Sequence, residues 1–119
     1  PLKSIEIFRL IESFSGVLTR KKEKGTHRVR FDGISIRQRI EEIVDLLARE
    51  KQLEFEALLE DVETKIELIV SFLAILEMAK MRLMKVYQTQ EGDLFLRPQF
   101  SDRQVVLDRL SGLDESQYV

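Results

Sequence analysis

The stretch from Thr64 to Arg97 constrains this chain most, because it joins a capped and almost wholly apolar helix to a short hairpin. Its first four residues, Thr64-Lys65-Ile66-Glu67, read as a capping box, in which two side chains satisfy free amide groups at a helix start. The helix is predicted to run to about Arg82. Strands are then predicted at 83–90 and 94–96, joined by the turn Glu91-Gly92-Asp93.

Three further helices are predicted before this stretch. The first, over Ser4–Arg20, has an apolar face wide enough to contact two neighbours at once. Ser35-Ile36-Arg37-Gln38 is another capping box, and apolar residues follow it at helical spacing to about Glu50. An extended link then leads into a short helix over Glu56–Asp61. Two weaker elements complete the prediction, a short edge strand over 27–32 and a helix in the tail that ends near Gly112.

The order of the central elements is helix, short strand, short helix, long helix, strand, strand, which is that of a winged helix-turn-helix domain. We therefore predict a mainly α fold with a small β-hairpin, in which this domain is preceded by a helical extension. The expected divisions are a helical extension with a basic linker at 1–33, the winged-helix domain at 34–98, and a C-terminal tail with a weak helix at 99–119.

The composition narrows the classes of function. The net charge is -2 over 119 residues, so no overall basic field draws the chain to nucleic acid or to anionic lipid. The absence of cysteine excludes disulfides, thiolate metal sites and cysteine nucleophiles, and it fits a cytoplasmic protein. The longest apolar run, Leu68–Ala79, is too short to span a bilayer, so we expect no membrane partner.

No residue pattern points to catalysis, a cofactor or a metal. His27 is the single histidine, and we expect it at the surface of a basic segment. Glu41, Glu42 and Asp45 share one helix face, for which a solvated face is the simpler interpretation than an acid–base pair. No glycine-rich phosphate loop is present. We therefore predict a protein that is not an enzyme and has no cofactor.

The long helix carries more apolar surface than one core contact requires. Each buried Leu, Ile or Phe contributes about 1.5–3 kcal/mol, so a second apolar stripe needs a cover of its own. That cover is either another part of this chain or a partner protein, and the residues leave both open. On a helical wheel one stripe is Ile66, Ile69, Val70, Leu73 and Leu76, the second is Leu68, Phe72, Ile75 and Ala79, and the arc expected to face water is Glu67, Ser71, Ala74, Met78 and Arg82.

DNA reading by this helix is disfavoured. Its expected water-facing arc offers few donors for base edges, and the preceding segment Glu54–Glu63 is acidic without a basic residue. Basic residues gather instead at Arg20–Arg30, which is either a solvated loop or a contact for backbone phosphates. A winged-helix transcription regulator that binds DNA is the alternative function, and it predicts salt-sensitive DNA binding.

The residues around this helix resemble the carboxy-terminal part of the bacterial kleisins, the segregation and condensation protein A subunits of SMC complexes. The likeness covers 35–97, and its nearest matches are VSFLAILEMAKMRLMKVYQ at Val70–Gln88 and GDLFLR at Gly92–Arg97. Ile5–Leu18 is a looser match to the helical middle region of that family.

The resemblance implies a non-catalytic subunit that helps to close an SMC ring for chromosome condensation and segregation. The winged-helix domain would dock on an SMC ATPase head, and the middle region would bind a dimer of segregation and condensation protein B (ScpB). DNA would be held only indirectly, through the complex. The implied location is the cytoplasm, in association with the nucleoid. The spare apolar stripe also leaves open self-association of the isolated fragment.

Candidate contact residues follow from the resemblance. The outer part of the long helix and the hairpin would touch the SMC head, and the first helix would touch ScpB. Because strand residues alternate faces, Leu94 and Phe95 cannot both point inward. The head candidates are Phe72, Ile75, Met78, Ala79, Tyr87, Leu94, Phe95 and Leu96, and the ScpB candidates are Ile5, Phe8, Phe14 and Leu18.

Overall fold

The computed structural model describes residues 3–4, 7–21 and 35–112. Ile5, His27 and the strand predicted over 27–32 lie outside these residues. In chain order the elements are β1 (Lys3–Ser4), α1 (Ile7–Arg20), α2 (Ile36–Glu50), β2 (Leu53–Glu54), α3 (Phe55–Glu60), α4 (Lys65–Lys80), β3 (Met84–Gln88), β4 (Leu94–Pro98) and α5 (Arg103–Leu110).

The segment from α2 to β4 has the winged-helix arrangement. β3 and β4 form an antiparallel hairpin in which Tyr87 lies opposite Phe95, and β2 pairs with the other edge of β4. The described strands are ordered β1-β3-β4-β2. The hairpin turn contains Gly92 at φ 98°, a left-handed conformation that glycine adopts without a Cβ clash. The predicted mainly α fold with a winged helix is confirmed.

Local hydrogen bonds explain where α2 and α4 begin. At α2 the capping box is complete, because Ser35 Oγ accepts from the Gln38 amide and the Gln38 side chain accepts from the Ser35 amide. At α4 only half of the predicted box forms. Thr64 Oγ1 accepts from the Glu67 amide at 3.1 Å, but the Glu67 carboxylate lies 3.5 Å from the amide of Glu63 instead. Both helix starts agree with the prediction.

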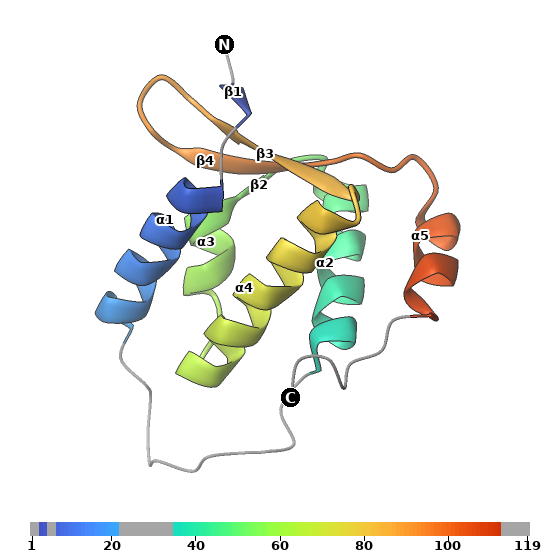
Figure 1. Cartoon of the computed structure of the whole chain (residues 1–119), viewed down its shortest axis with the longest axis horizontal. Helices are drawn as coiled ribbons and strands as arrows, with labels where there is room; N and C mark the ends of the chain where they lie inside the picture. The colour runs from blue at the N-terminus through green and yellow to red at the C-terminus, as the bar shows by residue number, and fades with distance from the viewer. Residues whose placement is uncertain (1–2, 5–6, 22–34, 113–119) are drawn as a thin grey trace.

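The sheet lies across one end of the helices, and its inner face closes the core (Figure 1). The buried residues alternate along the hairpin, as expected for strands with one face inward. Below the sheet, α2 and α4 supply most of the remaining core. The largest wholly buried side chains are Phe55, Ile40, Ile43, Leu47, Leu59, Leu68, Ile75, Met78, Leu83, Met84, Leu96 and Leu110.

The first and last helices pack on this same core. Leu10 and Val17 of α1 are buried, as are Val106 and Leu110 of α5. In Figure 1, α1 lies beside α3 and α4 on one side of the molecule, and α5 lies against α2 on the other. β1, which the sequence analysis missed, pairs with β3 and is too short to show a period of two. The divisions at 33 and 98 stay predictions, but the core continues across both.

A charged contact holds α5 to α2. The Arg103 guanidinium pairs with the Asp45 carboxylate, and this hydrogen bond, with the charge of Asp45, raises the pKa of Arg103. Arg109 also donates to the carbonyl of Met81 at 3.0 Å, so α5 is tied both to α2 and to the turn after α4.

Candidate protein-docking faces

One apolar stripe of the helix α4 lies at the edge of the core and is partly open to solvent. Ile66 is 43% exposed and Ile69 42%, while the other members of this stripe are half-buried. Their spacing places them along a single side of the helix, which runs across the front of the view in Figure 1. We call this set the α4 stripe: Ile66, Ile69, Val70, Leu73 and Leu76.

The arc of α4 that was expected to face water is instead largely buried. Ser71, Ala74 and Met78 have no exposed surface, because this side of the helix packs on α2. The Ser71 hydroxyl accepts a hydrogen bond from Arg39 Nε at 2.8 Å, which satisfies a polar group inside the contact. The prediction of a water-facing side at Ser71, Ala74 and Met78 is therefore wrong. The two small residues 71 and 74 let α2 approach closely.

Five of the eight head candidates lie in the core. Phe72 is 8% exposed and Leu94 7%, while Ile75, Met78 and Leu96 are wholly buried. These five side chains are covered by this chain itself, because the stripe containing Phe72 and Ile75 faces α1 and α3 and the inner strand residues face the helices. Ala79, Tyr87 and Phe95 are half-buried at the surface, so a head contact by these three stays a prediction.

The helix α1 adds a second apolar area beside the α4 stripe. Phe14 stacks on Phe72 with ring centroids 4.1 Å apart and planes inclined by 12°, so the chain itself covers this α4 residue. Toward solvent, Phe8 is 63% exposed and Ile11 47%, and Leu18 is half-buried. We call Phe8, Ile11 and Leu18 the α1 patch. Two of the predicted ScpB residues belong to it, and Phe14 lies at its inner edge.

Polar contacts fix α1 in place at its C-terminal end. Arg20 donates to the carboxylates of Glu56 and Glu60 on α3, at 3.0 and 3.2 Å. Lys21 Nζ donates to the carbonyl of Glu60 at 3.2 Å and to that of Val62. These contacts and the Phe14–Phe72 stack hold the α1 patch next to the α4 stripe.

The outer face of the sheet carries aromatic and basic side chains together. Tyr87 and Phe95 lie opposite each other on β3 and β4, and Lys85 lies opposite Arg97 one step along the same face. Lys85 Nζ is 5.7 Å and Arg97 Cζ 5.4 Å from the centre of the Tyr87 ring, within the range of cation–π attraction. We call these four residues the sheet platform. Its two rings were predicted from the sequence as head contacts, whereas its two cations were not predicted as contacts.

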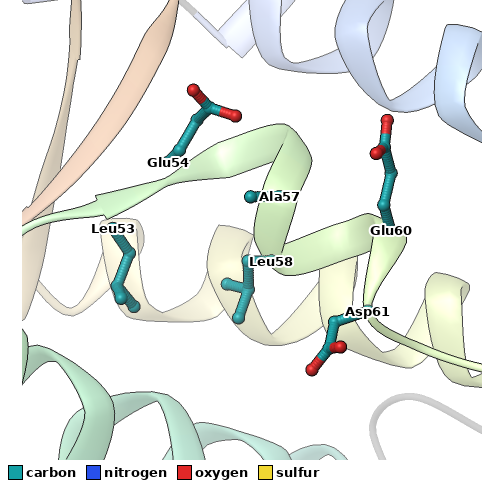
Figure 2. A pocket seen from close by; sticks show the side chains of 6 residues that line it. All are labelled: Leu53, Glu54, Ala57, Leu58, Glu60 and Asp61. Atoms are coloured by element: carbon teal, nitrogen blue, oxygen red, sulfur yellow. The ribbon is translucent and has the colours of Figure 1, made fainter.

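The hollows among the described residues do not resemble an active site. The hollow in Figure 2 lies along α3, and its lining side chains diverge: Leu53 and Leu58 point to one side, and Glu54 and Glu60 to the other. Glu60 is paired with Arg20.

The carboxylates of α2 that share one face are each paired with a basic side chain. Glu41 pairs with Arg37, Glu42 with Arg39 and Asp45 with Arg103. Across residues 3–4, 7–21 and 35–112, no group of three or more His, Asp or Glu side chains could hold a metal ion. In the same ranges, no helix has the length and apolar character needed to cross a membrane.

A winged helix in which α4 carries an apolar stripe toward solvent is consistent with the family likeness described above. The family model for segregation and condensation protein ScpA matches residues 3–96, which is most of the chain. This chain belongs to the ScpA family. That family is named for chromosome segregation and condensation, and the match begins at β1, so it includes α1 as well as the winged helix.

Curated relatives agree with the ScpA assignment. Segregation and condensation protein A of Myxococcus xanthus is 34% identical over 100 residues, covering 82% of this chain and 35% of the relative. The protein of the same name from Listeria monocytogenes is 36% identical over 93 residues, covering 74% and 37%. One from Clostridium botulinum is 29% identical over 98 residues, covering 80% and 39%. The chain thus spans little more than a third of the length of these relatives. No solved structure has a significant match to it.

Proposed function

We propose that this ScpA chain is a non-catalytic docking part of a kleisin, and that its α4 stripe binds the ATPase head of an SMC protein. Such a contact would help to close an SMC ring for chromosome condensation and segregation, in the cytoplasm and on the nucleoid. The observation that carries the proposal is the α4 stripe itself. Its five side chains are apolar and lie together on one side of the helix, where Ile66 and Ile69 are exposed and the other three are half-buried against the core.

The charges beside the α4 stripe also favour protein over duplex DNA. On the flanks of the neighbouring helix α3, Glu54, Asp61 and Glu63 are exposed carboxylates. These would repel phosphates from a duplex laid across α3 and α4. The alternative of a transcription regulator that reads DNA through α4 therefore has no structural observation in its favour.

The resemblance further assigns a ScpB dimer as a partner, and we propose the α1 patch as its contact. Phe8 is the most exposed of the large apolar side chains in the described residues, which suits a protein contact rather than a core position. Because the α1 patch lies beside the α4 stripe, the head and ScpB would bind close to each other on this chain.

The test is binding of purified variants to an SMC head fragment and to ScpB, by pull-down and by calorimetry. Ile69→Glu should weaken head binding at least tenfold, because a carboxylate would be buried without a partner. Phe8→Glu should weaken ScpB binding and leave head binding unchanged. Val105→Glu is the matched control, since Val105 is 54% exposed on α5, away from both faces.

Each result has a defined meaning. Unchanged head affinity of a folded Ile69→Glu variant, with full loss in Tyr87→Ala or Phe95→Ala, would reject the α4 stripe and move the contact to the sheet platform. Absence of head binding by the unmodified chain would reject the docking proposal as a whole.

A further inference from the structure

We propose that the sheet platform, formed by Lys85, Tyr87, Phe95 and Arg97, binds single-stranded nucleic acid. The proposal is independent of head docking, because it concerns the opposite side of the hairpin from the core and not the α4 stripe. It rests on the placement of two aromatic rings and two cations on one open sheet face.

The register of the hairpin brings the four side chains together. Tyr87 and Phe95 are directly opposite on adjacent antiparallel strands, and so are Lys85 and Arg97. Directly opposite residues of such a pair project on the same face with Cβ atoms about 5 Å apart. The result is a two-by-two block with an aromatic pair beside a cationic pair, on a sheet whose other face is filled by Val86, Leu94 and Leu96.

The two cations of the platform contact the Tyr87 ring and are not neutralised by a carboxylate of the described residues. Lys85 and Arg97 are exposed, and neither pairs with a carboxylate among the described residues. Arg97 Nε donates to the Gln52 side chain at 2.8 Å, which orients the guanidinium and leaves its terminal nitrogens available. By contrast, Arg20, Arg39 and Arg103 are each joined to acidic side chains.

The aromatic rings favour a single strand as the ligand over a duplex. Bases stack on aromatic side chains only when they are not already stacked and paired, and such stacking tolerates any base. A ring with a cation on or beside its face, as at Tyr87, is the arrangement that combines base stacking with phosphate contact. Among the described strand residues that pair with this block, the only carboxylate is that of Glu54, opposite Phe95 on β2, and it limits the phosphate path to the Lys85–Arg97 side.

The experiment is fluorescence anisotropy of a labelled oligodeoxythymidine with the purified chain, over a series of salt concentrations. Tyr87→Ala and Phe95→Ala should each weaken binding roughly 5- to 150-fold, the range that corresponds to loss of one stacking ring. Lys85→Gln should lower the slope of log affinity against log salt by about 0.7, the value for one phosphate contact on a single strand.

Matched controls are available elsewhere on the surface. Phe8→Ala removes an exposed ring from α1, and Lys80→Gln removes an exposed cation from the end of α4. Both should leave oligonucleotide affinity and the salt slope unchanged. Circular dichroism of every variant checks that the fold is kept, and an Arg97→Gln variant tests the second cation of the platform, with the same expected change in salt slope as Lys85→Gln.

Three outcomes would overturn the proposal. The first is no binding of the oligonucleotide at low salt, and the second is equal weakening by the control variants. The third is equal affinity for a duplex of the same length, which would show that the rings do not stack on bases. If the platform variants instead lose SMC-head binding while the oligonucleotide never binds, the platform is a protein contact and the nucleic-acid proposal fails, whereas head docking stands.

Discussion

The assignment of α4's faces can be tested by truncating two isoleucines that lie on different faces of the same helix, one facing the core and one facing solvent. Ile75 is wholly buried, and Ile69 is 42% exposed on the α4 stripe. The substitutions Ile75→Ala and Ile69→Ala each remove three carbon groups, and both positions lie within the same helix, away from its ends. Differences in helix propensity therefore cancel, and only the environment of the side chain differs.

The expected cost follows from burial. Three carbon groups at about 0.8 kcal/mol each correspond to about 2.4 kcal/mol of lost transfer free energy at full burial. A closed cavity at Ile75 adds to this, so Ile75→Ala should reduce the free energy of unfolding by about 3–4 kcal/mol. At Ile69 the site is open to water and leaves no closed cavity, so Ile69→Ala should cost about 1 kcal/mol.

The assay is urea unfolding followed by far-UV circular dichroism. With an m-value of about 2 kcal/mol per molar urea, the midpoint should fall by about 1.5–2 M for Ile75→Ala and about 0.5 M for Ile69→Ala. Equal midpoints for the two variants would refute the assigned orientation of α4. Repeating the measurement at two protein concentrations tests whether self-association contributes to the result. If an association covered Ile69, the stability lost in Ile69→Ala would increase with protein concentration.

Three other substitutions test particular contacts by the same unfolding assay. Ser35→Ala should cost about 1 kcal/mol by removing the α2 capping box, while Ser15→Ala, at an exposed position of α1, should change little. Ser71→Ala should cost about 1–3 kcal/mol because it removes the acceptor for Arg39 Nε inside the α2–α4 contact, and a cost near zero would show that this bond adds nothing. Lys51→Gly should raise stability by about 0.5–1 kcal/mol, since Lys51 has φ 68° at the end of α2 and glycine adopts that conformation freely; a lower midpoint would contradict it.

Most of the winged helix could be predicted because its signals are local. The hydroxyls of Ser35 before α2 and Thr64 before α4 accept hydrogen bonds from amides in the first turn, so both helix starts were located correctly. The turn around Gly92 set the register that places Tyr87 opposite Phe95. The second half of the α4 capping box was predicted wrongly, because the Glu67 carboxylate accepts from the amide of Glu63 and not from that of Thr64. The residue pattern does not indicate which of these two neighbouring amides the carboxylate contacts.

The candidate faces were harder to predict because their members are chosen by distant neighbours. The wheel separated the two apolar stripes of α4 correctly, but it assigned the partner contact to the stripe that is buried. Phe72 is covered because Phe14, far earlier in the chain, stacks on it. Ser71 looks like a surface residue in the sequence and is buried because Arg39 supplies a donor.

The order of residues thus specified where the helices and the hairpin begin and end, since capping and periodicity act within a few residues. It also required that α4 have two apolar sides, because nine apolar positions cannot share one stripe. Which of these sides meets the core and which meets solvent was settled only by the packing of α1 and α2, since burial depends on neighbours that the chain brings together across many residues.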